Sequence, residues 1–564
     1  MAPAPSARIL VVFAAVAAAP LCVAGQPPHL PLVPLERAER SLVVALDPTQ
    51  IAAMAGRTAL TIDLPAADGR LVTVRLERFD VLPPGVTPQA ASMDGGAMPL
   101  ENRVQLWRGD IEGLPDSRVY IGFAPGVAQG FIDTGADIQY IATPQGSAVT
   151  LITAATDFDP NQRLDVICNG ALIPPGMDLT IAEEESGGYA PRGGPCRVLE
   201  IAIDADVEFG ELFPTTQMAA DYIQLLMGAV SSIYRAETDS VLISPFVRIW
   251  EETDPWTAES TSPQLSEFRS WWRSNMQSQP RSLAHLLSGR SLGGGVAWVR
   301  QACSTNYGYA VSANMRGSFP FPIQDNNSSN WDLMVVAHEL GHNLGTGHTH
   351  DPNSYSPIID GCGSDPRDCT VASAGEGTIM SYCHTCSGGM RNMRMRFGPR
   401  VDDTIRNYIN GPAAGCGTTQ SPPTLLQQPA PVVSLCPGSD LRLEVTATGT
   451  SIRYQWSRNG SPIPDATGPV YTVPAAQLVD SGLYACTIRN DCGELTSEPA
   501  SVLIVTTPSC QPCPADWDGS GGVDGDDIAA FFSDWQSGSA DIDQSGGTDG
   551  DDITFFFARW QSGC

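Results

Sequence analysis

The stretch VVAHELGHNLGTGHTHD, residues 335–351, holds four of the seven histidines of this chain and one glutamate. Residues i and i+4 lie on one face of an α-helix, so a helix here would offer His338 and His342 to the same metal ion. Gly345 can take the left-handed conformation that ends a helix, which lets the chain turn back and present His348. The spacing therefore predicts a metal site with three imidazole ligands.

Three neutral imidazoles leave a tetrahedral zinc ion one open position, which is typical of a catalytic site. Zinc lowers the pKa of a bound water from about 15.7 towards 7. Glu339 lies beside the ligand face, where it could accept the proton of that water as the water attacks a peptide carbonyl. His350 is out of register with the other three histidines, and we expect it to lie in solvent or next to the ligands.

The full pattern H-E-x-x-H-x-x-G-x-x-H resembles that of the metzincin zinc endopeptidases, and AHELGHNLG most resembles their adamalysin, or reprolysin, branch. The resemblance implies an α/β catalytic domain, with a mixed sheet and an active-site helix, over residues 196–416. It also implies a methionine turn beneath the zinc, for which Met380 in GTIMSYCH is suitably placed. The substrate would lie antiparallel to an edge strand, matched by GGGVAWVRQACS at residues 293–304.

Two features depart from the adamalysin pattern. Aspartate usually follows the third histidine directly, whereas Thr349 and His350 intervene here. Tyr382 is instead similar to the tyrosine of the astacin and serralysin branches, which can ligate zinc or steady the developing oxyanion; simple packing is the alternative. The resemblance also implies disulfides between Cys303 and Cys416 and between Cys362 and Cys369, although sequence does not fix connectivity.

The composition limits the class of protein. Sixty-two acidic residues against 32 basic ones give a net charge of −30, which argues against nucleic acid as a partner. Residues 1–25 are typical of a secretory signal peptide, with a membrane anchor as the less favoured alternative. We therefore expect a secreted protein, extracellular or associated with the cell surface, with no membrane span and with most cysteines in disulfides. On that ground CHTC, residues 383–386, is expected to form disulfides and not a second zinc site.

At 564 residues the chain is expected to hold several domains. Alternating apolar and polar runs predict a β-rich region over residues 26–192, and residues 107–144 look like the propeptide that precedes adamalysin-like domains. Cys168 could then occupy the open zinc position and keep the enzyme latent; a disulfide with Cys196 is the alternative. The acidic, glycine-rich passage 182–196 indicates an exposed, cleavable connector.

Proline-rich residues 417–431 are interpreted as a linker to a β-sandwich at residues 432–506. Trp456, Tyr484 and Cys486 fit the buried tryptophan and the tyrosine corner of an immunoglobulin-like domain. Cys436 lies too far before Trp456 to be the usual cysteine between the sheets. We expect it to pair with Cys492, leaving Cys486 as a small buried hydrophobe.

The final segment, residues 510–564, contains two copies of an acidic loop and an apolar helix, 25 residues apart. Each copy has oxygen ligands at the spacing of a calcium loop, followed by a glycine at the sharp turn, Gly521 or Gly546. The ligands are Asp516, Asp518, Ser520, Asp524 and Asp527, then Asp541, Asp543, Ser545, Asp549 and Asp552. The duplication resembles type I dockerin modules, small α-helical domains that bind cohesins; an acidic disordered tail, or a calcium-clamped module with no cohesin partner, are the alternatives.

Together these features predict a secreted, zinc-dependent endopeptidase made as a latent proenzyme, with a protein or peptide substrate and bound Zn²⁺ and Ca²⁺. One rival is an inactive surface-assembly or binding protein anchored through its dockerin-like module. Retention of three histidines together with Glu339 counts against that rival. A second rival is a zinc hydrolase of a non-peptide substrate.

Overall fold

The computed structural model describes residues 30–38, 41–55, 57, 59–93, 96–144, 146–154, 157, 171–175, 195–317, 331–373, 376–505, 514–520 and 523–562. The predicted signal peptide, Cys168 and Gly521 lie outside these residues.

The N-terminal unit, residues 30–154, is β-rich, as its alternating sequence indicates. Nine described strands form one antiparallel sheet in the order β1-β2-β11-β10-β9-β8-β7-β4-β3. Their bounds are β1 (Leu32–Arg37), β2 (Leu42–Leu46), β3 (Ala59–Pro65), β4 (Leu71–Phe79), β7 (Gln105–Ile111), β8 (Leu114–Ala124), β9 (Val127–Asp133), β10 (Ile138–Ala142) and β11 (Thr150–Ala154). Helix α1 (Pro48–Met54) is capped by Asp47, whose carboxylate accepts from the backbone N–H groups of Thr49 and Gln50.

The central unit, residues 195–416, is built on a mixed sheet in the order β12-β16-β17-β15-β13-β14-β5-β6, with β18 beside β13. Neighbours from β17 to β14 run parallel, and β16 runs antiparallel to β17. The strands are β5 (Gln89–Ala91), β6 (Met98–Pro99), β12 (Ala171–Leu172), β13 (Cys196–Ala205), β14 (Ser240–Trp250), β15 (Leu283–Leu287), β16 (Gly295–Trp298), β17 (Tyr309–Ser312) and β18 (Thr418–Gln420). Strands β5, β6 and β12 come from the region expected to be a propeptide, so that region contributes strands to both edges of the central sheet.

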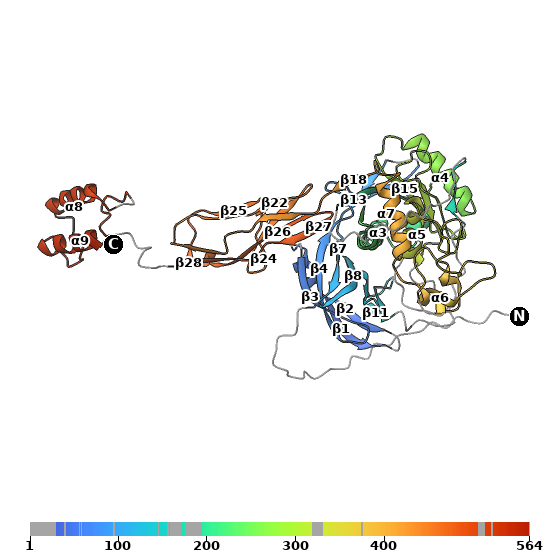
Figure 1. Cartoon of the computed structure of the whole chain (residues 1–564), viewed down its shortest axis with the longest axis horizontal. Coiled ribbons are helices and arrows are strands. Elements are labelled where there is room, and N and C mark those ends of the chain that lie inside the picture. Colours follow the sequence, from blue (N-terminus) through green and yellow to red (C-terminus); the bar gives the residue numbers. More distant parts are fainter. Residues whose placement is uncertain are drawn as a thin grey trace.

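The central unit also contains helices, several of which pack against its sheet. These helices are α2 (Val207–Gly210), α3 (Thr216–Thr238), α4 (Thr261–Asn275), α5 (Trp331–Asn343), α6 (Thr370–Ser373) and α7 (Pro399–Asn410), with 3-10 turns η2 (Cys383–Thr385) and η3 (Gly389–Asn392). Helix α3 lies between the central sheet and the N-terminal sheet, packing against β14, β8, α5 and α7 (Figure 1). No helix among the described residues is long and apolar enough to cross a bilayer.

A β-sandwich follows from residue 421 to residue 505. Its strands are β19 (Thr424–Gln427), β20 (Val432–Leu435), β21 (Leu441–Glu444), β22 (Thr446–Thr448), β23 (Arg453–Arg458), β24 (Ser461–Pro462), β25 (Val470–Val473), β26 (Gly482–Asn490), β27 (Gly493–Thr496) and β28 (Ala500–Ile504), with the turn η4 (Leu478–Asp480). Trp456 and Tyr484 are fully buried, and the Tyr484 hydroxyl donates to the Asp480 carbonyl at 2.7 Å. Cys486 is a buried free thiol, as expected.

Residues 417–431 do not form the simple linker that their composition suggested. Strand β18 pairs with β13 of the central sheet, and β19 pairs with β22 of the sandwich. Proline-rich sequence therefore supplies an edge strand to each of two folded units, in keeping with the tolerance of sheet edges for proline.

Two predicted disulfide pairings are wrong. Cys492 bonds to Cys196 and not to Cys436, because β18 holds the sandwich against the start of β13. The same bond excludes the alternative of Cys168 with Cys196.

The Cys362 prediction fails for a similar reason. Cys362 bonds to Cys383, and Cys369 bonds to Cys386, so two bridges join the 362–369 loop to the 383–386 segment. The expected disulfide between Cys303 and Cys416 is confirmed. CHTC, residues 383–386, thus forms disulfides, and no second zinc site is built from its cysteines.

The C-terminal module, residues 514–562, pairs helices α8 (Gly525–Ser537) and α9 (Gly550–Ser562). Phe531 and Phe556 stack with their ring centroids 4.1 Å apart. The indole N–H of Trp535 donates to the Asp549 carbonyl, and that of Trp560 donates to the Asp524 carbonyl. Each helix therefore holds the loop that leads into the other, and in Figure 1 the module lies at the far end of the sandwich.

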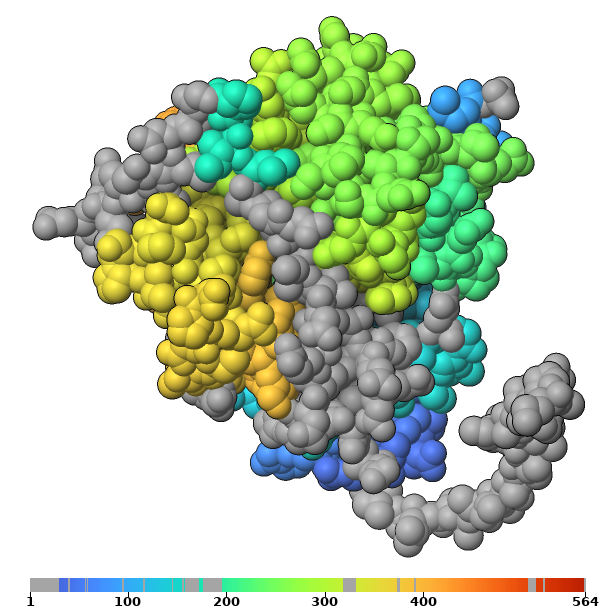
Figure 2. Space-filling view, turned by 90° about the vertical axis from the view of Figure 1, so that its right-hand side faces the viewer, coloured from blue at the N-terminus to red at the C-terminus, as the bar shows by residue number. Residues whose placement is uncertain are grey.

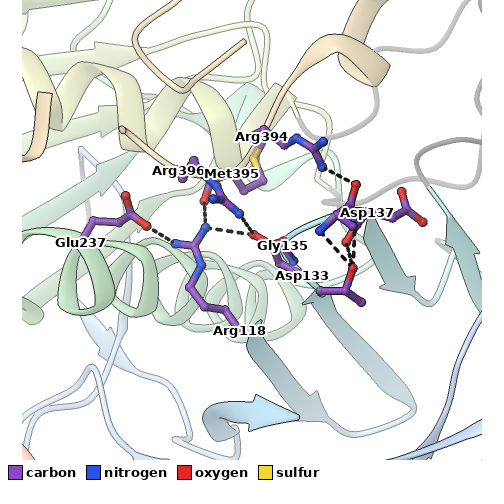
Figure 3. A network of polar contacts seen from close by, with 10 residues as sticks. Arg118, Asp133, Gly135, Asp137, Glu237, Arg394, Met395 and Arg396 are labelled. Atoms are coloured by element: carbon purple, nitrogen blue, oxygen red, sulfur yellow. Dashed lines mark hydrogen bonds and ion pairs between the residues drawn. The ribbon is translucent and has the colours of Figure 1, made fainter. Parts of the chain in front are cut away.

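A network of ion pairs joins the N-terminal unit to the central unit (Figure 3). The Arg118 guanidinium contacts the carboxylate of Asp133 at 3.0 Å and that of Glu237, on α3, at 2.7 Å. Arg396 of the central unit also contacts Asp133, at 2.9 Å. Burial, together with the neighbouring Glu237 carboxylate, raises the pKa of Asp402 on α7 to about 9.

Asp402 therefore makes the stability of the protein depend on pH. The folded protein keeps the Asp402 proton up to about pH 9, whereas the unfolded chain loses it near pH ~3.9. Since the folded state then binds more protons, the free energy of unfolding should fall as pH rises between these two values. Asp402→Asn should lessen this fall, measured as Tm across pH 5–9 by circular dichroism. Asp403→Asn removes a carboxylate from the same helix as a control, and equal slopes for Asp402→Asn and the parent would contradict the assignment.

Candidate metal centre

Helix α5 carries two of the three histidines and is buried on every side. All of its residues are buried, and His338 and His342 are 3% and 0% exposed, so both imidazoles lie in the protein interior. Its first turn is fixed by Asp332, whose carboxylate accepts from the backbone N–H groups of Arg316 and Gly317. The hydroxyl of Tyr222 on α3 donates to the same carboxylate at 2.7 Å. Helix α5 thus has its N-terminal turn tied to α3 and to the loop after β17.

His338, His342 and His348 come together in one cluster, with one ring nitrogen of each within 4.8 Å of those of the others. The Nδ1 of His338 donates to the Ile379 carbonyl at 2.7 Å, and that of His342 donates to the Thr346 carbonyl at 2.9 Å. These hydrogen bonds place the lone pair of each ring on Nε2. The Nε2 of His338 is buried and has no hydrogen-bond partner among the residues that the structure describes.

The electrostatics of the cluster also suit a cation. Burial lowers the pKa of His342 to about 4 and holds the pKa of His338 and His348 well below the usual range. The imidazoles are therefore neutral ligands at physiological pH. Three neutral nitrogen donors that lie this close together fit a zinc ion.

The third histidine is presented by a turn that requires glycine. Gly345 has φ +114°, and a Cβ at this position would lie 2.5 Å from the Cβ of Tyr408. The chain reverses here and brings His348 back to the helix, as the sequence predicts. Conformation and space both exclude a side chain at residue 345.

Glu339 lies on the side of α5 that faces the edge strand β16. It is fully buried, and a Cβ built on Gly295 of β16 would lie 2.1 Å from its Oε1. The carboxylate therefore occupies the space that a side chain at residue 295 would need. The sequence placed Gly295 in the predicted substrate strand, residues 293–304, but did not reveal its contact with Glu339, because the two residues are 44 positions apart.

Met380 lies beneath α5, where a Cβ on Gly341 would come within 2.7 Å of its sulfur. Its carbonyl accepts from the backbone N–H of Thr349 at 3.3 Å and from the Thr349 hydroxyl at 3.1 Å. Thr349 follows His348 directly and is fully buried. It joins the third histidine to the methionine turn, a role that the sequence pattern alone did not reveal.

Tyr382 and His350 pack around the third histidine. The Tyr382 hydroxyl lies 3.2 Å from the Nε2 of His348. The His350 ring stacks on that of His348, with centroids 5.1 Å apart and planes 9° apart. His350 thus lies beside a predicted ligand and not in open solvent. Of its two expected positions, the one next to the ligands is the one observed.

The edge strand β16 is fixed to the C-terminal end of α5 and paired on its outer side. The side-chain amide of Asn343 donates to the carbonyls of Trp298 and Tyr309. Residues Ala171 and Leu172 of β12 pair in parallel with Ala297 and Trp298. Figure 2 shows residues 171–175, in teal, on the surface beside a yellow-green segment, in keeping with the pairing of β12 with β16. In this structure the outer edge of β16 is therefore occupied by a segment of the N-terminal region.

The second candidate metal region is in the C-terminal module. Carboxylate oxygens of Asp516, Asp518 and Asp527 lie within 4.8 Å of one another, as do those of Asp541, Asp543 and Asp552. Asp524 instead caps α8, where its carboxylate accepts from the Asp526 N–H.

The second loop resembles the first. Asp549 accepts from the Asp551 N–H, and the Asp541 carboxylate accepts from the backbone N–H groups of Ser545 and Gly546. Gly546 has φ +99°, as expected for the sharp turn. For Ser520 the structure shows a backbone N–H donated to Asp518. The structure thus gathers three of the five predicted ligands of each loop.

Comparison with known families agrees with the site in the central unit. Residues 196–395 match the profile of metallo-peptidase family M12, and residues 420–505 match that of the immunoglobulin domain. The two matches support a metalloprotease that carries an immunoglobulin-like domain. The M12 family implies zinc as the metal of the histidine cluster.

Similarity to individual proteins is limited to short stretches. The decoration protein of Escherichia phage T5 is 36% identical over 90 residues, 16% of this chain and 54% of that protein. The human mucosa-associated lymphoid tissue lymphoma translocation protein 1 is 35% identical over 83 residues, 14% of this chain and 10% of that protein. The chain thus spans about half the length of the first relative and a tenth of the second.

Solved structures give similarly local matches. A chimeric titin Z1Z2 is 24% identical and covers 16% of this chain and all of that one, with a TM-score of 0.14. Sidekick-1 immunoglobulin domains 1–5 are 25% identical over 15% of this chain and 18% of that one, with a TM-score of 0.15.

The contact between Gly295 and Glu339 predicts a specific defect. Gly295→Ala should displace the Glu339 carboxylate while leaving the three histidines in place. Displacing a catalytic group by about 1 Å can cost on the order of 10²-fold in rate. We expect a fall of that order in kcat for a peptide substrate, with zinc content unchanged by metal analysis. Gly415→Ala is the control, because a methyl group there meets no atom within 4 Å; full activity in Gly295→Ala would show that the contact is unimportant.

Proposed function

We propose that this protein is a secreted zinc endopeptidase of the metzincin type, made as a latent proenzyme, with Glu339 as its general base. The observation that carries the proposal is the buried cluster of His338, His342 and His348 with the Glu339 carboxylate next to it. The match of residues 196–395 to metallo-peptidase family M12 supports the same reaction class.

A zinc ion held by the three histidines would polarise the scissile carbonyl and acidify the attacking water. Glu339 would accept the proton of that water and return it to the leaving amine. Its carboxylate is fully buried against the edge strand, where little bulk water competes for the proton. The edge strand β16 would hold an extended peptide, which favours a peptide substrate over a small ester or amide.

Tyr382 is proposed to support the reaction through its hydroxyl. This group lies 3.2 Å from the Nε2 of His348, so it is within reach of whatever binds at the ligand face of that ring. A phenol donor there would stabilise negative charge that develops on the substrate oxygen.

Latency is proposed to arise from the N-terminal region. Strand β12 pairs with β16 in the parallel sense, whereas a substrate is expected to run antiparallel to this strand. The backbone N–H of Val299 also donates to the Leu172 carbonyl at 2.9 Å. A substrate would have to displace β12, and Cys168, three residues earlier in the chain, would supply a thiolate to the zinc.

The catalytic proposal predicts the effect of changing the base and removing the metal. Once Arg192 and everything before it have been removed, so that β12 and Cys168 are absent, the protein should digest denatured protein, and a zinc chelator should stop it. Glu339→Gln should reduce kcat by roughly 10²–10⁴-fold or more while zinc content stays the same. Glu376→Gln makes the same chemical change at an exposed residue and should remain active. The proposal fails if the zinc-loaded parent cleaves nothing or if Glu339→Gln is as active as the parent.

The C-terminal module is proposed to bind two calcium ions and to attach the enzyme to a partner outside the cell, as dockerin modules do with cohesins. Support comes from the two sets of three clustered carboxylates, one in each repeat. Hard oxygen donors at this spacing suit calcium. Without a cation, three carboxylates this close would repel one another.

Calcium binding can be measured directly. Isothermal titration of the full chain with Ca²⁺ should show two sites, and both should disappear in Asp516→Ala plus Asp541→Ala. Asp526→Ala plus Asp551→Ala removes the same charge from the neighbouring helix starts and should retain both sites. No heat from the parent protein would refute the calcium proposal.

A further inference from the structure

The N-terminal unit does not lie over the metal centre. It covers the opposite region of the central unit, along α3, and Figure 1 shows its sheet on the far side of α3 from α5. Along β8, Val119, Ile121 and Phe123 point into the unit's own core, while Tyr120 belongs to the core shared with α3. Because alternate residues of a strand face opposite sides, the N-terminal sheet has two buried faces, one of which is complete only when α3 is present.

The contact between β8 and α3 is unusually close because glycines face it from both sides. A Cβ on Gly122 of β8 would lie 2.4 Å from a methyl carbon of Leu225. A Cβ on Gly228 of α3 would lie 2.8 Å from the Tyr120 hydroxyl oxygen and 2.9 Å from a methyl carbon of Leu106. The two surfaces therefore fit each other at van der Waals contact, with no room for even one added methyl group.

Hydrogen bonds and ion pairs between polar groups cross the same interface. The Tyr120 hydroxyl is fully buried and donates to the Leu225 carbonyl. Arg118 joins Glu237, and Arg103 joins Asp221 on α3 at 2.7 Å. The Arg118–Glu237 pair is largely buried at both ends, whereas Arg103 is partly exposed and Asp221 is buried. Removal of the arginine from either pair leaves a largely buried carboxylate without its partner across the interface, which is costly.

The sandwich completes the binding site for the N-terminal unit. It is joined to the central unit by the Cys196–Cys492 disulfide and by the pairing of β18 with β13. Arg489 of the sandwich donates to the carbonyl of Arg78 in the N-terminal unit at 3.4 Å. In the other direction, Arg57 of the N-terminal unit donates to the carbonyl of Gly460 in the sandwich at 3.5 Å. The N-terminal unit is thus in contact with two parts of the chain that follow the connector.

We infer that the N-terminal unit remains bound as a non-covalent subunit after the chain is cut in the connector before residue 195. Its partner is the α3 face of the central unit, together with the sandwich. If the unit left, the apolar side chains of α3 that now meet Leu106 and Tyr120 would be exposed to water, at a cost that scales with the area uncovered. This inference does not depend on the proposed protease activity.

The test uses the full chain with residues 183–188 replaced by the recognition sequence of a site-specific protease. Glu339→Gln prevents self-digestion, and Cys168→Ser removes the only cysteine between residues 26 and 192, so that any retention is non-covalent. After complete cutting, both fragments should elute together in gel filtration at the size of the intact protein. Elution of the N-terminal fragment by itself would overturn the inference, whether or not the protein is a protease.

Two further variants test whether the α3 surface is responsible. Arg118→Ala removes the largely buried ion pair that Glu237 of α3 makes with the N-terminal unit. Gly228→Leu places a bulky side chain that a helix accepts but the β8 surface does not. Each should speed dissociation of the cut fragments by roughly a hundredfold. Arg75→Ala is the matched control, because Arg75 forms an exposed pair with Asp110 within the same unit. Dissociation of both test variants at the parent rate would refute the assigned interface.

Discussion

The position of helix α5 depends on close steric contacts that only glycine allows. Gly295 leaves room for the Glu339 carboxylate, Gly341 for the Met380 sulfur, and Gly345 for the Tyr408 side chain. Each contact would fall below 3 Å if a methyl group were added. The edge strand, the methionine turn and α7 are therefore in direct contact with this helix or the turn after it. Because a catalytic constellation loses rate steeply with small displacements, these three contacts define the geometry on which the histidine cluster depends.

Most of the features that the sequence predicted correctly depend on residues close together in the chain. His338 and His342 share a helix face because of helical periodicity, and Gly345 reverses the chain because of its own backbone freedom. The contacts of Thr349 and Asn343 were missed, because each joins segments that only the fold brings together. The same distinction explains the cysteines. The Cys303–Cys416 disulfide was predicted correctly from a family resemblance. The partners of Cys362 and Cys492 instead depend on how a loop and the sandwich lie against the central unit, which the sequence does not show.

Helix α3 shows that the role of the N-terminal region was partly readable from sequence. A helix that covers one side of a sheet is expected to be polar on its outer face, whereas residues 216–238 are apolar nearly all round. That pattern indicates a second layer of structure on the outer face. The N-terminal sheet is this layer, and Asp221, one of the few charged residues of the helix, pairs with Arg103, which lies just before β7 of that sheet. A region that resembles a disposable propeptide is therefore also part of the packed interior of the protein.

The two ends of the central unit are fixed at one place. Its first strand, β13, pairs with β18, which follows the unit's last disulfide, and Cys196 at the start of β13 bonds to Cys492 in the sandwich. A cut between β18 and β19 would therefore leave the sandwich attached. A cross-link between residues so distant in sequence restricts the unfolded chain more than a local one does, in the chain-entropy account of disulfides. A cut in the connector would create a new chain end shortly before Cys196. That end would already be linked to the sandwich by the Cys196–Cys492 disulfide. The sandwich is thus attached to the central unit at two places, and a cut in the connector would leave both attachments intact.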